Sequence, residues 1–185
     1  NKETVQERNL EKVEDCFSFK ETPTATWINI DGLHDVSVIE KIGGHFNIHP
    51  LVLEDILNTA QRPKFEDMDS HLFIVLKMLH FDDSSQSVQS EQVSIVLAEN
   101  YVISFQEKIG DVFEQIRDRI RNDKGRIRKT GPDYLMYALL DAIVDSYFGI
   151  LEKLGEKIES LEDELVGTPT EQTLKKIHHL KKEMV

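Results

Sequence analysis

The chain has 185 residues, of which 39% are hydrophobic and 30% are charged, and its formal net charge is −12. A chain of this length can bury a core of its own, and this composition is globular rather than disordered. The single cysteine, Cys16, excludes an intramolecular disulfide and a cysteine-based zinc or iron–sulfur site, which favours a reducing compartment. No uninterrupted apolar run approaches the roughly 18 residues that cross a bilayer, so we expect neither a membrane span nor a signal peptide in these residues.

The charges form two neighbouring blocks of opposite sign. Residues 117–129 have a local balance of +5, whereas residues 133–164 have a balance of −7. Acidic surroundings repel a polyanion and no aromatic residue interleaves the arginines, so nucleic-acid binding is disfavoured. The alternative is that these arginines pair with acids elsewhere in the chain or in a neighbouring subunit.

The first part of the chain predicts short elements separated by proline and glycine. Residues 1–22 are typical of a polar helical lead-in that ends before Pro23, and residues 27–30 predict a short strand. Apolar residues at helical spacing predict a short helix over 36–46. A second short helix follows His49, because Pro50 suits the first helical position.

Three strand-like runs follow, at residues 72–81, 93–97 and 101–105. Short connections make consecutive strands antiparallel neighbours, so these runs predict a three-stranded meander. One more helix is expected after Gly110, with Ile116 and Ile120 on its apolar side. Helices before and after the strands indicate an α/β domain with helices packed on a sheet.

A long helix then carries apolar residues in steps of three and four. This seam predicts a helix–helix contact over four heptads; its members are Tyr137, Leu140, Val144, Tyr147, Leu151, Leu154, Ile158, Leu161 and Leu165. A second stripe in the first half, formed by Leu135, Leu139 and Ile143, indicates burial against the α/β domain on two sides.

A partner helix is expected directly after the long one. Thr168 as N-cap, Pro169 at the first position and Glu171 form a helix start, and a tight reversal at Gly167 predicts an antiparallel hairpin. The apolar face of this helix is Leu174, Ile177, Leu180 and Met184. Since no C-cap precedes Val185 and no methionine begins the chain, we expect a fragment of a longer protein.

Two pairs of carboxylates are the candidate ligands. Glu54 and Asp55 lie within an otherwise apolar short helix, and Asp141 and Asp145 are one turn apart on the long helix. Such acids need either basic partners and solvent, or a hard divalent cation that prefers oxygen ligands. No phosphate loop, nucleophile elbow or zinc-protease motif is present, so catalysis is not indicated.

Several motifs together resemble the CorA magnesium and cobalt channels. They are HPLVLEDIL at 49–57 with QRPK at 61–64, TWINI at 26–30, SEQVS at 90–94, FQEKIGDVF at 105–113, and DYL with LDA at 133–135 and 140–142. The resemblance extends over nearly the whole chain from Pro23 onward.

The resemblance implies a homopentameric channel in the cell (inner) membrane, with this portion on its cytoplasmic side. It implies metal sensing by Glu54, Asp55, Asp141 and Asp145 at the interface between identical subunits, with Mg²⁺, Co²⁺ or another divalent cation bound. The fold that it implies is a mixed, largely antiparallel sheet flanked by helices, followed by a long helical hairpin leading to a truncated stalk helix. The expected parts are an α/β cytoplasmic domain over 1–132, the long hairpin helix over 133–167, and the start of the stalk over 168–185.

The resemblance also implies that membrane helices follow beyond Val185 in the full-length protein. Two other interpretations stay open: the zinc-transporting branch of the same superfamily, and a structural oligomerisation module whose acids serve solubility only. Neither an enzyme nor a nucleic-acid-binding protein is expected.

Overall fold

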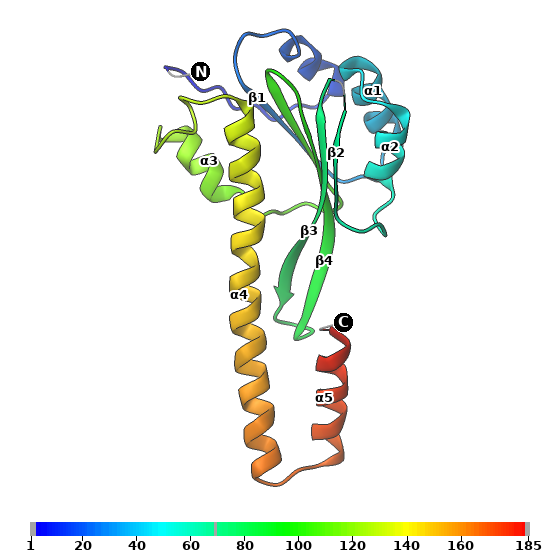
Figure 1. The fold of residues 1–185 in the computed structure, drawn as a ribbon, viewed down its shortest axis with the longest axis vertical. Coiled ribbons are helices and arrows are strands. Elements are labelled where there is room, and N and C mark those ends of the chain that lie inside the picture. Colours follow the sequence, from blue (N-terminus) through cyan, green and yellow to red (C-terminus); the bar gives the residue numbers. More distant parts are fainter. Residues whose placement is uncertain (1–2, 69, 184–185) are drawn as a thin grey trace. The chain divides into compact units, whose positions relative to one another are not determined.

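A computed structural model describes residues 3–68 and 70–183. These residues form two compact units: one contains the residues up to Met78 together with Glu91–Ile143, and the other contains Leu79–Ser90 and the residues from Val144 onward. Figure 1 shows the elements in chain order. They are η1 (Val13–Phe19), β1 (Thr26–Asp31), α1 (Val36–Phe46), α2 (Pro50–Leu57), β2 (Lys64–Asp67), β3 (Leu72–Asp82), β4 (Ser87–Leu97), β5 (Tyr101–Gln106), α3 (Glu114–Arg121), α4 (Pro132–Val166) and α5 (Glu171–Glu183).

The five strands form one sheet in the order β1-β5-β4-β3-β2. β4 pairs with β5 and β2 pairs with β3 in antiparallel fashion, whereas β1 pairs with β5 in parallel, with Trp27 opposite Val102. The sheet is therefore mixed and largely antiparallel, and the order β3-β4-β5 confirms the expected meander. Strand β2 was not predicted, because its four residues, KFED, carry a single apolar side chain.

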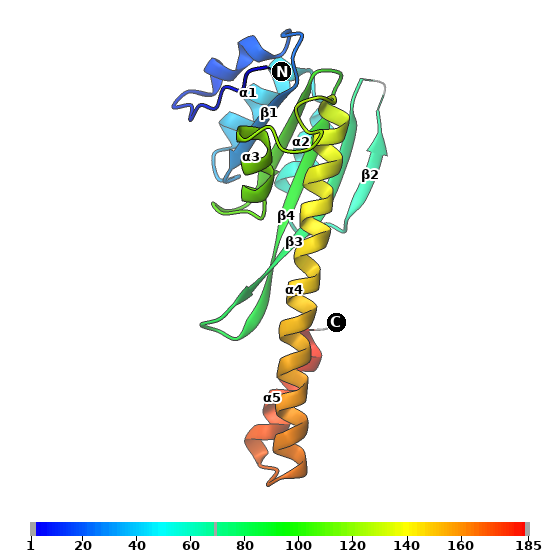
Figure 2. The ribbon, with the colours of Figure 1, turned by 90° about the vertical axis from the view of Figure 1, so that its left-hand side faces the viewer.

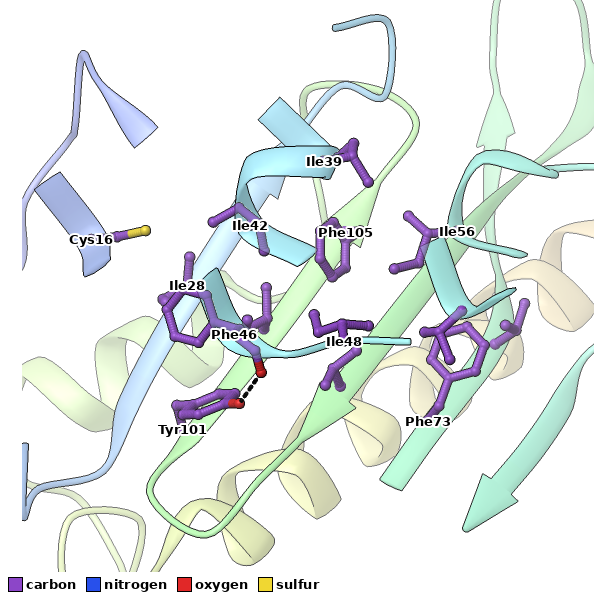
Figure 3. Close-up of a cluster of buried hydrophobic side chains, with 14 residues drawn as sticks. Cys16, Ile28, Ile39, Ile42, Phe46, Ile48, Ile56, Phe73, Tyr101 and Phe105 are labelled. Atoms are coloured by element: carbon purple, nitrogen blue, oxygen red, sulfur yellow. Dashed lines mark hydrogen bonds between the residues drawn. The ribbon is translucent and has the colours of Figure 1, made fainter. Parts of the chain in front are cut away.

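One face of the sheet packs against η1, α1 and α2 (Figures 1 and 2). Figure 3 shows this core, where Ile39 and Ile42 of α1 and Ile56 of α2 meet Phe105 of the sheet. The Tyr101 hydroxyl donates to the carbonyl of Phe46 at 3.3 Å. A methyl group at Gly43 would overlap the Leu53 side chain as it now lies, so glycine there lets Leu53 of α2 pack closely against α1.

The opposite face is covered by α3 and the first part of α4 (Figures 1 and 2). Phe113 packs edge-on against Trp27 with ring centroids 5.8 Å apart, and Leu135, Leu139 and Ile143 of α4 are buried. The second stripe is thus the one that packs into the core. The expected seam is wrong in this half, since Tyr137 is 57% exposed.

The second unit joins the ends of β3 and β4 to the later part of α4 and to α5. Lys153 contacts both Asp83, at 2.9 Å, and the Phe81 ring, at 4.7 Å. α5 runs back along α4 as an antiparallel partner (Figure 1), and Leu161 and Leu180 are each 6% exposed. Only part of the seam is buried here, because Leu151 is 61% exposed. Met184, expected on the same face, lies outside the described residues.

Helix α5 begins at a different threonine from the one expected. The backbone N–H of Thr173 donates to the Thr170 hydroxyl at 3.2 Å, and the N–H of Thr170 is 3.3 Å from the Thr173 hydroxyl. Thr170 is therefore the N-cap, and Thr173 takes the reciprocal role that Glu171 was expected to fill from a cap at Thr168.

The expected N-terminal helical lead-in needs correction. Only residues 13–19 of the N-terminal lead-in are helical, as the short 3-10 helix η1, and residues 4–10 have no regular structure.

In the described part of the chain, α4 alone is long and apolar enough to cross a membrane by length and composition. Asp141 and Asp145 interrupt its apolar run, and its first half owes its apolar residues to packing on the sheet.

Candidate metal-binding surfaces

Helix α2 presents Glu54 and Asp55 at the surface of the first unit. His49 caps the helix by accepting from the N–H of Leu51 at 3.2 Å, and Pro50 occupies its first turn. Val52 and Ile56 point into the core and are fully buried. Helical periodicity therefore turns Glu54 to solvent and leaves Asp55 at the rim of the core.

The Asp55 carboxylate contacts a lysine of strand β2. Asp55 Oδ2 lies 2.6 Å from Lys64 Nζ, and the same nitrogen lies 2.9 Å from Glu66 Oε1. Lys64 and Glu66 are two residues apart on one strand, so their side chains share the face that looks towards α2. Lys64 is the last residue of the QRPK motif, but no sequence pattern indicates its pairing with Asp55, because strand β2 has no recognisable strand pattern.

The main chain of Asp55 is also held in place. The side-chain amides of Gln61 and of Gln92, a fully buried residue of β4, both donate to the Asp55 carbonyl. Gln92 Nε2 also lies 3.2 Å from the carbonyl of Ile56. These bonds satisfy carbonyl groups that the end of a helix leaves without intrahelical partners.

Asp141 and Asp145 are exposed on α4. They lie one turn apart, in the first and the second unit respectively. Asp141 is on the helix that covers one face of the sheet, while Asp55 is on a helix that covers the other (Figures 1 and 2). The fold of one chain therefore does not bring Asp55 and Asp141 together.

The candidate ligands fit a divalent cation in chemistry but not in number. Carboxylate oxygens are the ligands that Mg²⁺ prefers, and Mg²⁺ keeps several waters when it binds one or two of them. Within residues 3–68 and 70–183, no three His, Cys, Asp or Glu side chains are grouped as a metal site requires. Each pair is thus at most part of a site that other groups complete.

Asp31 and Asp111 form a second acidic cluster next to α3, and Arg117 of that helix forms an ion pair with Asp111. Arg117 binds the 5%-exposed side chain of Asp111 through two bonds of 2.7 and 2.5 Å, and its guanidinium lies 5.2 Å from the Trp27 ring centroid. Burial raises the pKa of Asp111, but the bonds from Arg117 and from the N–H of Phe113 outweigh it and leave that pKa below its ordinary value.

Asp31 lies at the edge of the same cluster, and its pKa is shifted in the opposite direction from that of Asp111. Burial, together with repulsion from Asp111, raises the pKa of Asp31. The Gln106 amide bridges the two acids, with contacts of 3.1 Å to Asp31 and 3.3 Å to Asp111. Because Arg117 already neutralises Asp111, this cluster is an internal ion-pair network.

Two further arginines of the basic block, Arg119 and Arg121, also have partners within the chain. Arg121 binds Glu7 at 2.7 Å and Glu114 at 2.6 Å, and Arg119 lies 3.4 Å from the Tyr134 hydroxyl. These contacts agree with the interpretation that arginines of this block pair with groups elsewhere in the chain.

The structure resembles the soluble domain of CorA from Methanocaldococcus jannaschii with a TM-score of 0.69 and 22% identity, covering 85% of this chain and 62% of that one. It also resembles the cytoplasmic domain of ZntB from Vibrio parahaemolyticus, with a TM-score of 0.60 and 15% identity over 76% of this chain and 56% of that one. At these identities the likeness concerns the fold alone.

The sequence identifies the family. The model of the CorA-like Mg²⁺ transporter proteins matches residues 24–185, and this chain belongs to that family. It is 48% identical over 99% of its length to the cobalt/magnesium transport protein CorA of Thermotoga maritima, and 26% identical over 74% of its length to the putative metal ion transporter YfjQ of Bacillus subtilis. The chain spans 52% and 41% of these two relatives, respectively. The family is one of transporters, in agreement with the expectation that the chain is not an enzyme.

Proposed function

We propose that this chain is the cytoplasmic, metal-sensing part of a divalent-cation channel of the inner membrane, with Mg²⁺ and Co²⁺ as its cargo. The observation that carries this proposal is the 48% identity, over 99% of the chain, to a cobalt/magnesium transport protein. In this proposal the α/β domain extends to residue 132, the long helix of the hairpin covers 133–167, and the stalk begins at 168.

We further propose that Glu54, Asp55, Asp141 and Asp145 are parts of regulatory metal sites between identical subunits of a homopentamer. Glu54, Asp141 and Asp145 are exposed, and the two pairs lie on different helices, which suits ligands contributed to neighbouring copies. Bare carboxylates on facing subunits repel, and a partly hydrated Mg²⁺ between them reverses the repulsion. The cation thereby favours the closed ring only if it binds that state more tightly than the open one.

The test is the oligomeric mass of the full-length protein and of the 185-residue chain, with and without millimolar Mg²⁺. We expect a Mg²⁺-stabilised pentamer that Asp55→Asn and Asp141→Asn both weaken. Asp118→Asn is the matched control, because Asp118 is an exposed acid of α3 that pairs with Arg121 at 3.4 Å. If Mg²⁺ acts no differently from the same ionic strength of NaCl, the acids serve solubility and the structural-module interpretation replaces the sensor.

The cargo is tested separately. The full-length protein in liposomes should admit Mg²⁺ and Co²⁺. Selective uptake of Zn²⁺ instead would place the protein in the zinc-transporting branch while leaving the proposed sensor intact.

A further inference from the structure

Lys64 lies between two carboxylates, one of which is a proposed metal ligand. Its ammonium is 2.6 Å from Asp55 Oδ2 and 2.9 Å from Glu66 Oε1. The Phe73 ring centroid lies 5.5 Å away, so an aromatic face borders the ammonium on a further side. In this chain the Asp55 carboxylate is therefore paired with the side-chain ammonium of Lys64.

The environment makes this contact stronger than an ordinary surface ion pair. The side chains of Lys64, Asp55 and Glu66 are 27%, 25% and 36% exposed, so water screens them only in part. Pairing to β3 places Lys64 opposite Val75 and Glu66 opposite Phe73, two buried core residues. Strand pairing thus fixes the point from which the lysine reaches towards α2.

Lys64 has a second carboxylate partner, Glu66, on its own strand. An ammonium is a compact point charge with three donors on a flexible stem, and it satisfies one carboxylate as readily as two. Because Glu66 shares its strand and its face, Lys64 keeps an acidic partner when Asp55 is engaged elsewhere. Releasing Asp55 then costs part of one ion pair rather than leaving a half-buried charge alone.

We propose that Lys64 is an intramolecular competitor of the divalent cation: it occupies Asp55 when the site is empty and withdraws to Glu66 when the cation binds. This inference rests on the proposed sensor and adds its regulation. A divalent cation and an ammonium on the same carboxylate repel each other, so each must displace the other. Lys64 therefore lowers the affinity of the sensor and sets the cation concentration at which it responds.

The proposal predicts the sign of a charge-removing substitution. In the full-length protein, Lys64→Gln should lower the Mg²⁺ concentration at half-maximal protection from proteolysis by about tenfold, the order expected when a neighbouring unit charge is removed. Lys64→Arg keeps the charge and pairs with carboxylates more strongly, so its midpoint should stay the same or rise. Ionic strength is held constant with NaCl.

Lys41→Gln is the matched control. Lys41 forms an ion pair of similar length, 2.7 Å, with Glu14, but at an exposed position on α1. It removes the same charge from the same unit without touching Asp55, so the Mg²⁺ midpoint should not move. An equal shift in Lys41→Gln and Lys64→Gln would reduce the effect to net charge and overturn the competitor role.

Two outcomes separate the competitor from the sensor. If Asp55→Asn abolishes the Mg²⁺ response but Lys64→Gln leaves the midpoint unchanged or raises it, the sensor stands and the competitor role is wrong. If Asp55→Asn itself leaves the response intact, Asp55 is not a ligand and both proposals fail.

A measurement on the unsubstituted chain avoids any effect of mutation on folding. The side-chain ammonium of Lys64 can be followed by NMR during a Mg²⁺ titration of the full-length protein, in which the proposed sites between subunits can form. A change in its signal at the midpoint of Mg²⁺ binding supports displacement from Asp55. Saturation with Mg²⁺ without any change at Lys64 overturns it.

Discussion

The side-chain amide nitrogen of Gln92 lies 3.1 Å from the main-chain carbonyl oxygen of Asp55. This bond joins the central strand β4 to the last turn of α2 and so fixes the backbone that carries a proposed metal ligand. The same nitrogen reaches Ile56 on α2 and the Ser94 hydroxyl on its own strand. A buried polar residue of the sheet thus determines where the surface carboxylate lies.

We expect Gln92→Leu to lower the free energy of unfolding by about 1–3 kcal/mol, because it leaves the carbonyls of Asp55 and Ile56 without this donor in a buried place. Chemical denaturation measures the loss. Gln115→Leu, at an exposed position of α3, makes the same substitution where nothing is buried and should change stability by less than about 0.5 kcal/mol. Equal effects at both positions would argue against a capping role for Gln92.

The ion pair of Asp111 with Arg117 should make stability depend on acid. The folded-state pKa of Asp111 lies below its ordinary value of 3.8, so its contribution is complete above that value and is lost as the pH falls through the lowered pKa. Asp111→Asn should therefore cost about 1–3 kcal/mol at pH 7, and its difference from the unsubstituted chain should shrink below about pH 4. Urea unfolding across pH 2–7 measures this difference, and a difference that does not vary with pH would contradict the assignment.

The contribution of Asp31 to stability should change with pH in the opposite direction from that of Asp111. Its folded-state pKa is raised above 3.8 by burial and by Asp111, so ionisation in the folded state is unfavourable and stability falls as the pH rises through the raised pKa. Asp31→Asn keeps a side-chain oxygen for the Asn29 and Gln106 amides and removes the charge. We expect a gain of a few tenths of a kcal/mol at pH 7, limited by solvent screening, and none at pH 3. A loss of stability at pH 7 would show that the charge itself is needed.

The position of the α5 cap gives a test between two nearby threonines. Thr170→Ala should destabilise the start of α5 by about 1 kcal/mol, because the N–H of Thr173 loses its acceptor. Thr168→Ala, which lies before the cap, should have almost no effect. Amide hydrogen exchange in the first turn of α5 reports both, and a larger effect at Thr168 would restore the start that the Thr-Pro-Thr-Glu pattern suggested.

Local patterns predicted many elements of this chain but not their burial. Pro50 and the apolar spacing around Val52 and Ile56 were enough to place α2, because helix starts and helical periodicity depend on neighbouring residues. The seam of α4 shows where local patterns failed to predict burial. Tyr137 and Leu135 belong to two overlapping apolar stripes on one helix, and only contact with the sheet decides that Leu135 is buried while Tyr137 is exposed.

The sequence by itself determined the family, the short helices, the meander and the helical hairpin, because these follow from motifs and from periodicities within about 20 residues. The tertiary structure decided the parallel pairing of β1 with β5, between residues more than 70 positions apart, and the existence of β2 at the edge of the sheet. It also decided which basic side chain pairs with the Asp55 carboxylate. Lys64 reaches that carboxylate because β2 pairs with β3 beside α2, a contact that depends on the packing of the whole domain and that no local pattern encodes.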